Sequence, residues 1–577
     1  MTINTDKFRK AIRKIIIFLF AYLSVSVLYA QNRMEPPKLI KQWNSVNSFT
    51  SETKANIDKL PIRVDLKKAV ELSVHCLNSQ FNRDKQDEPY FYCQRRADGT
   101  GEMKHYVEIG IPHVVGRSML GSEMAQLKVG VPFPLEGFDI YERYCKQSFD
   151  NPDNLNSYYK DNKRGVEMHN MREGLWSLWT LIVGRNSGWA KETAHKMLES
   201  LDKITDADGK WSAEMAKKNN LSITGGIIPD NQARMVDPLL AYYAATDDKL
   251  ALKLAGMYAQ VGLNALYDKE GKFTPFGQSS GHIHRITSSL SGITRYAILM
   301  NDKKMIDKCI LVMEKGLPEY FSSWGWGDEV MPAHPANVIS QGEINQTGDV
   351  IRTALYLGAA GHTKFYELAE RYLRSMLLPS QLWMDDLKKF LKENVNPKDD
   401  TEKDLLNRSL GGFGFSLPNA RMKNSEYRVE TQDITSGAVH ALAECWEHKL
   451  VSENNQCKLN LFFDAANNAF EIKSYLPKQG LIEITAKANK TLLIRVPAWV
   501  NLKTIKLSIN GEDTSVVIDN NYIIITGLKQ GSKSTVTFDI PCKIELETVD
   551  GSVYRTTWLG NQIIDITPRG ELSPLPF

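Results

Sequence analysis

The fold class follows from residues 171–182, which read MREGLWSLWTLI. The apolar residues Met171, Leu175, Leu178 and Ile182 step by four, three and four positions. Because an α-helix turns once every 3.6 residues, this spacing places all four side chains on one face. The stretch therefore predicts an amphipathic helix that packs one face against other elements.

The same spacing recurs along the chain to about residue 450. One-sided apolar stripes occupy residues 194–204, 251–261, 306–317 and 365–376. Short polar turns join the helices, and successive turns lie roughly 55 to 60 residues apart, as expected of repeated helical hairpins. Such hairpins stack as an open solenoid or close into a ring. We favour an (α/α)6-type toroid over residues 166–452, with 31–165 as its loop-rich and helical N-terminal part.

Near residue 455 the apolar period changes to two, which is typical of β-strands. Leu459, Leu461 and Phe463 alternate with polar neighbours, and Asn510-Gly511 is a strong hairpin signal. Residues 453–577 are therefore predicted to form a C-terminal β-sandwich, so the chain as a whole is mostly α and then β.

Residues 1–30 have the pattern of a signal peptide, with a basic start and an apolar core at 15–27. An uncleaved anchor is the alternative. This segment holds five basic residues and one acidic residue, and the remaining chain has 66 basic and 67 acidic residues, a net charge of −1. We expect an exported bacterial protein, periplasmic or secreted, that contacts neither nucleic acid nor the membrane after cleavage.

The seven cysteines are scattered, and no two of them form a C-x-x-C motif. This pattern favours neither a zinc ribbon nor a small disulfide scaffold. Cys76 and Cys93 could pair in an oxidising compartment, but buried free thiols are the expected state of most of the seven.

Ionisable and aromatic residues gather between the helical stripes. They lie in 108–117 (EIGIPHVVGR), 167–173 (EMHNMRE), 281–285 (GHIHR), 324–329 (WGWGDE) and 342–349 (GEINQTGD). Glycoside hydrolysis needs such a mixture, because one carboxyl group protonates the leaving oxygen and another activates water or attacks carbon. Indole faces and polar side chains would hold the sugar ring.

Each of these segments also has a structural interpretation. Glu173 could be a helix N-terminal charge with Arg172 as its solvated partner, and Glu343 could cap the helix that follows it. On a strand, His282 and His284 would point in opposite directions, so only one would face a ligand.

Taken in order, the segments resemble the clan around the β-L-arabinofuranosidases of glycoside hydrolase family 127, over roughly residues 165–577. Four segments correspond in order. The stretch from 169 onward resembles the family's His-rich segment, and 281–285 resembles its Gly-His-x-x-Arg motif. Further on, 324–329 resembles its Gly-rich acidic loop, and 343–345 resembles its Glu-x-Cys segment. Its sandwich has an (Ile/Leu)-Arg-(Ile/Val)-Pro-x-Trp strand and an Asn-Gly turn, which read Ile494–Trp499 and Asn510-Gly511 here. The resemblance implies a toroid, a sandwich and glycosidase activity.

The chain departs from this family where the family holds its zinc-bound Cys nucleophile. Asn345 stands in place of the Cys of Glu-x-Cys, and the paired Cys expected before the last toroid helix is replaced near 433–435. Cys445 alone cannot rebuild such a centre. We therefore expect no metal and no cofactor, with carboxylate chemistry on the same scaffold. The region through His113 and Arg117 also resembles family 154, in which β-glucuronidase activity is known.

These observations predict an exo-acting glycoside hydrolase that removes a terminal sugar, a uronic acid by preference, from an oligosaccharide or polysaccharide. Glu343 is predicted to share the acid–base work with Asp328 or Glu329, which are adjacent, so that at most one faces the cleft. A uronate carboxylate needs Arg, His or Lys opposite it. The predicted substrate-binding residues are His113, Arg117, His169, Arg172, Glu173, His282, His284, Arg285, Trp324 and Trp326.

Two other functions fit the same residues. A polysaccharide lyase on uronic-acid polymers would use Tyr or His as base and Arg or Asn to neutralise the carboxylate. A non-catalytic glycan-binding protein would bind sugars without turnover.

Overall fold

The computed structural model describes residues 42–45, 64–106, 110–160, 163–276, 282–331, 341–419 and 428–570. The predicted signal peptide, 1–30, lies outside the described residues, as do Glu108 and Gly281 of the quoted motifs. Among the described residues, no helix is long and apolar enough to cross a membrane.

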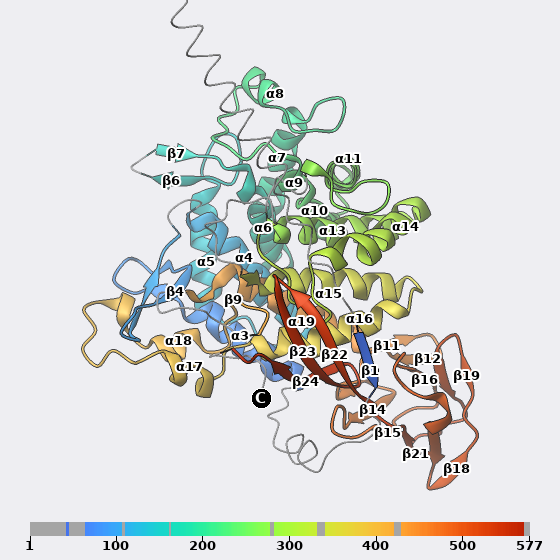
Figure 1. The fold of residues 1–577 in the computed structure, drawn as a ribbon. Coiled ribbons are helices and arrows are strands. Elements are labelled where there is room, and N and C mark those ends of the chain that lie inside the picture. Colours follow the sequence, from blue (N-terminus) through green and yellow to red (C-terminus); the bar gives the residue numbers. More distant parts are fainter. Residues whose placement is uncertain are drawn as a thin grey trace, which may run out of the picture.

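In the part of the chain that the structure describes, six helices form a closed inner ring (Figure 1). Each packs against the next, and the last packs against the first. In chain order they are α4 (Ile111–Met124), α6 (Met171–Arg185), α10 (Val236–Thr246), α13 (Ile283–Leu299), α15 (Ile344–Ala359) and α19 (Gln432–Lys449). The predicted toroid is therefore confirmed, and it is closed.

Outer helices alternate with the inner ones along the chain and complete six helical pairs. They are α3 (Leu66–Ser79), α5 (Leu135–Ser148), α7 (Gly188–Ile204), α11 (Lys249–Leu266), α14 (Lys303–Leu311) and α16 (Lys364–Tyr372). The outer helix α7 buries one face, as its stripe predicts. The inner helix α6 instead buries every residue from Met171 to Leu181, because neighbours surround it on all sides.

The inner helices approach one another closely. A Cβ atom on Gly116 of α4 would lie 2.1 Å from the backbone oxygen of Glu173 in α6. Only glycine fits at this contact, which accounts for Gly116 in the segment 108–117.

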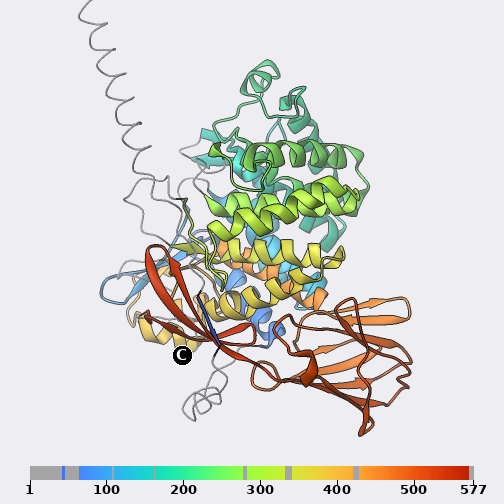
Figure 2. The same cartoon turned by 45° about the vertical axis from the view of Figure 1, so that its right-hand side comes forward.

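The β-sandwich lies beside the toroid (Figure 2) and consists of two sheets. One holds β11 (Leu450–Glu453), β12 (Gln456–Leu459), β16 (Thr491–Arg495), β20 (Tyr522–Ile525) and β19 (Ile518–Asp519). The other holds β13 (Ala465–Ala466), β14 (Phe470–Ser474), β15 (Leu481–Ala486), β21 (Lys533–Thr537), β17 (Lys506–Ile509) and β18 (Glu512–Thr514). Asn510 and Gly511 turn between β17 and β18 with φ of 54° and 89°, as the predicted hairpin requires.

The last strands differ from the prediction, because they leave the sandwich. β22 (Cys542–Val549), β23 (Ser552–Leu559) and β24 (Gln562–Thr567) form a separate sheet with β1 (Gln42–Ser45). Trp558 and Ile563 of this sheet are buried in the core of the toroid. The sandwich proper therefore ends before residue 542.

All seven cysteines are free, and all but Cys542 are buried. The buried-thiol interpretation holds for these six, and Cys76 does not pair with Cys93.

A buried ion network joins the sandwich to the toroid. Arg495 of β16 is 1% exposed and donates to Glu367 at 2.7 Å and to Glu370 at 2.5 Å, both on α16. Its Nε also donates to the backbone oxygen of Asn460 at 2.6 Å. The Arg of the strand motif 494–499 is therefore one point at which the two domains are held together.

We predict that Arg495→Met lowers the free energy of unfolding by about 3 kcal/mol, because it leaves carboxylates buried with fewer partners. Thermal unfolding should show a lower midpoint for this variant than for Lys506→Met, which removes an exposed cation from the same domain. Equal midpoints for the two variants would show that the network does not stabilise the interface.

Candidate active site

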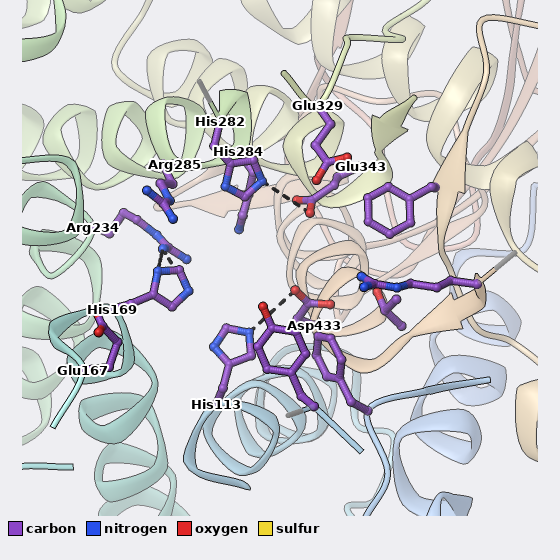
Figure 3. A pocket seen from close by; sticks show the side chains of 15 residues that line it. His113, Glu167, His169, Arg234, His282, His284, Arg285, Glu329, Glu343 and Asp433 are labelled. Atoms are coloured by element: carbon purple, nitrogen blue, oxygen red, sulfur yellow. Dashed lines mark hydrogen bonds and ion pairs between the residues drawn. The ribbon is translucent and has the colours of Figure 1, made fainter. Parts of the chain in front are cut away.

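A cavity of about 330 Å³ opens at one end of the toroid. Most of its lining side chains are ionisable, and Figure 3 shows them pointing inward from several elements. The lining residues are Phe91, Tyr106, His113, Glu167, His169, Arg234, His282, His284, Arg285, Glu329, Glu343, Phe415, Arg428, Thr431 and Asp433.

The N-terminal ends of the inner helices surround this cavity. His113, His284 and Asp433 lie in the first turns of α4, α13 and α19, and Glu343 immediately precedes α15. His169 and Arg234 each precede an inner helix by two residues. Because a helix N-terminus carries partial positive charge and free N–H groups, this end of the toroid favours anions.

Glu329, Glu343 and His282 form one wall of the cavity. His282 Nε2 lies 3.4 Å from Glu343 Oε1. One nitrogen or carboxylate oxygen from each of the three side chains lies within 4.8 Å of the other two. Burial and the neighbouring Glu343 carboxylate raise the pKa of Glu329 to about 7. Glu343 is also buried, but the charge and hydrogen bonding of His282 lower its pKa below the ordinary value. Below about pH 7 the wall therefore holds one carboxyl group that is mainly protonated, Glu329, and one that is ionised, Glu343.

Backbone pairing selects Glu329 rather than Asp328 for the cavity. The backbone oxygen of Glu329 accepts from Ile283 at 2.9 Å, and its N–H donates to Gln341 at 2.6 Å. These bonds place Glu329 beside His282, and Gln341 also donates to the Glu329 carboxylate at 2.8 Å. Asp328 does not line the cavity. Its predicted catalytic role is therefore withdrawn in favour of Glu329.

Asp433 and His113 lie on the opposite side of the cavity from Glu329 and Glu343 (Figure 3). His113 Nε2 lies 3.6 Å from Asp433 Oδ2, and His113 Nδ1 lies 3.7 Å from the buried carboxylate of Glu173. Arg117 donates to the backbone oxygen of Asp433 at 2.6 Å. Although Asp433 is desolvated, hydrogen bonding and charge from His113 lower its pKa far below the ordinary value.

A basic wall lies beside these groups. Arg234 is 2% exposed and contacts His169 Nδ1 at 3.0 Å. Burial and the neighbouring Arg234 charge lower the pKa of His169 well below its usual range, so this imidazole is neutral at pH 7. Arg285 lies 3.5 Å from Asp230, and its buried Nε has no hydrogen-bond partner among the described residues. The wall can therefore receive an anionic group.

Seven predicted site residues line the cavity: His113, His169, His282, His284, Arg285, Glu329 and Glu343. His282 and His284 both face it, contrary to the expectation for a strand, because they begin helix α13. Glu343 occupies the N-cap position of α15 but makes no capping hydrogen bond through its side chain.

Besides Asp328, five predicted residues lie elsewhere. Arg117, Arg172 and Glu173 are buried beneath the cavity, where Glu173 pairs with Arg172 rather than with a solvated partner. Trp324 and Trp326 are 0% and 3% exposed, and their indole N–H groups donate to the backbone oxygens of Pro418 and Ser416. The prediction that these two indoles stack on a sugar is therefore wrong. The aromatic rings at the cavity are those of Phe91, Tyr106 and Phe415.

Sequence reasoning missed Arg234, Arg428 and Asp433 as site residues. Arg234 precedes the apolar run that begins at Met235, as His169 precedes the run from Met171. A polar residue directly before an apolar helical run is therefore the sequence signal that indicates Arg234. Arg428 gives no such signal, because strand β10 (Arg428–Thr431) reaches the cavity only by pairing with β4 (Tyr92–Arg95).

Comparison with known proteins relates this chain to others by structure alone. No family model and no curated protein matches the sequence. A family 127 β-L-arabinofuranosidase from Geobacillus stearothermophilus is 13% identical with a TM-score of 0.54, over 90% of this chain and 86% of its own. A second family 127 β-arabinofuranosidase is 14% identical with a TM-score of 0.55, over 90% and 83%. The chain thus has the fold that its resemblance to family 127 predicted.

The zinc–thiolate centre implied by that resemblance does not fit this site. None of the seven cysteines lines the cavity. Asn345, in place of the expected Cys, is fully buried, and neither polar atom of its amide has a hydrogen-bond partner among the described residues. Among the described residues, two clusters at the cavity have a spacing that could hold a cation: His282 with Glu329 and Glu343, and His113 with His169 and the buried Glu173. That no metal is needed stays a prediction.

Proposed function

We propose that the protein is an exo-acting glycoside hydrolase that removes a terminal uronic acid by carboxylate acid–base catalysis. The observation that carries this proposal is the Glu329–Glu343 pair, because two neighbouring carboxyl groups with pKa values moved in opposite directions divide the acid and base roles. In the proposal Glu329 protonates the leaving glycosidic oxygen, and the ionised Glu343 takes a proton from water.

The size and charge of the cavity support the substrate class. A volume of about 330 Å³ is at the lower end for small-molecule sites and suits one terminal sugar better than a long chain. Arg234 and Arg285 lie together on one wall, next to the N-terminal ends of the inner helices. A uronate carboxylate placed there would meet guanidinium donors and positive helix ends. Export to the periplasm or cell surface would bring the protein to such glycans.

One observation favours the lyase as second candidate. Tyr106, His113 and Arg428 also line the cavity, and a lyase needs a Tyr or His base and a cation opposite the carboxylate. A lyase product contains a new double bond and absorbs in the ultraviolet, whereas a hydrolysis product does not. Product spectra of the wild-type protein therefore separate the two functions.

We predict that Glu329→Gln and Glu343→Gln each lower kcat on a cleaved uronide by about 10² to 10⁴-fold, because each removes one of the two proton-transfer groups. Activity should be screened on a panel of aryl glycosides and oligosaccharides, with product analysis. Asp328→Asn is the matched control and should stay within about threefold of wild type, since Asp328 does not line the cavity. Full turnover by both Gln variants, each shown to be folded, would contradict the assignment.

We further predict that Arg285→Gln lowers kcat/KM for a uronide by roughly 10 to 100-fold, because a hydrogen bond to a charged group contributes about 1.5 to 3 kcal/mol. The effect should fall mainly on KM and should be small for the neutral glycoside of the same linkage. Arg555→Gln, at an exposed position of the C-terminal sheet, is the control. An equal loss of kcat/KM on charged and neutral substrates would mean that Arg285 does not bind the carboxylate.

A further inference from the structure

Resting on the proposed glycosidase function, we infer that Asp433 is the catalytic nucleophile and that hydrolysis passes through a covalent glycosyl–Asp433 ester. This carboxylate lines the cavity but belongs to neither member of the acid–base pair. The inference follows from where Asp433 lies, what holds it and how accessible it is.

The position of Asp433 fits a nucleophile. Glu329 and Glu343 enter the cavity on one side, and Asp433 points into it from the opposite side (Figure 3). Displacement at an anomeric carbon needs a proton donor at the leaving oxygen and a nucleophile on the other face of the ring. Glu329 and Glu343 cannot divide these tasks between two faces, because they are neighbours within one cluster of less than 4.8 Å. Asp433 is placed for the second face.

Several neighbouring groups hold Asp433 in place. His113 touches Asp433 on one side and Glu173 on the other, so the imidazole bridges a cavity carboxylate and a buried one. Arg117 holds the backbone oxygen of Asp433. Asp433 also lies in the first turn of α19, where the helix end stabilises a negative charge. A carboxylate held in this way is ionised and oriented before substrate arrives.

The Asp433 carboxylate suits a nucleophile better than a general base. The low pKa of Asp433 makes it a weak base, and a general base works best with a pKa near the working pH. An ionised carboxylate can still attack carbon and later leave it. The Asp433 side chain is 17% exposed, whereas that of Glu343 is 7% exposed, so Asp433 is the more accessible of the two ionised groups.

The reaction then has two balanced steps. In the first, an Asp433 oxygen attacks the anomeric carbon, the glycosidic C–O bond breaks, and the leaving oxygen takes its electron pair and the proton of Glu329. In the second, water loses a proton to a carboxylate of the Glu329–Glu343 pair and attacks the anomeric carbon, and the ester bond to Asp433 breaks with its electrons returning to the carboxylate. Two displacements leave the anomeric configuration unchanged.

The test uses the full-length protein and the 2-deoxy-2-fluoro, 2,4-dinitrophenyl derivative of the uronide that it cleaves fastest, which slows the second step. We expect one glycosyl adduct by intact mass, located by peptide mapping at Asp433. Separately, Asp433→Gly should lose at least about 10³-fold in kcat/KM, and added azide should restore turnover by forming a glycosyl azide. Asp328→Gly, the matched control, should show neither the loss nor the response to azide.

Several outcomes would overturn the inference while leaving the proposed function intact. These are an adduct at Glu329 or Glu343, no adduct with a substrate that the wild type hydrolyses, or inversion of the anomeric configuration by NMR. Adduct mapping decides the question where Asp433→Gly folds poorly, because the adduct is measured on wild type. If the wild type turns over no glycoside, the proposed function fails first and the nucleophile assignment fails with it.

Discussion

The site depends on one buried carboxylate. Glu173, in the first turn of α6, is 0% exposed and lies within 3.7 Å of Arg172, Arg234 and His113. The charges of these groups hold the pKa of Glu173 at about 2 despite its burial. Because the surrounding helix ends and guanidinium groups are all positive, they could not share this small volume without an interior counter-charge. The negative charge of Glu173 thus stabilises the basic wall of the cavity.

The closed ring explains why residues so distant in sequence meet. Each inner helix begins at the same end of the toroid, so a side chain at or just before a helix start reaches the common cavity. The carboxylates then differ in pKa through their neighbours. Desolvation and the Glu343 charge raise the pKa of Glu329. His282 lowers the pKa of Glu343, and His113 lowers the pKa of Asp433. One scaffold supplies both a proton donor and ionised groups, without a thiolate at position 345.

Much of this arrangement could be predicted from sequence, for identifiable physical reasons. Stripes such as 194–204 identify outer helices, because those helices bury one face, and hairpin spacing identifies the toroid. Seven cavity residues can be predicted from the sequence, because the segments rich in ionisable residues lie at or before the starts of inner helices. Trp324 and Trp326 were misassigned, since sequence does not distinguish a buried indole from one in a cleft. Arg428 was missed because its position depends on pairing between strands more than 300 residues apart.

The most direct measurement is the pH dependence of kcat/KM on a cleaved uronide, for wild type and Glu343→Gln. Glu329 must be protonated to act as acid, so activity should fall as pH rises through about 7, the raised pKa of this group. Replacing Glu343 removes the negative charge that helps to raise that pKa, so the residual activity of the variant should fall at lower pH. A wild-type profile that stays flat from about pH 5 to 9, or a falling limb that does not move in Glu343→Gln, would contradict the assignment of Glu329 as the acid.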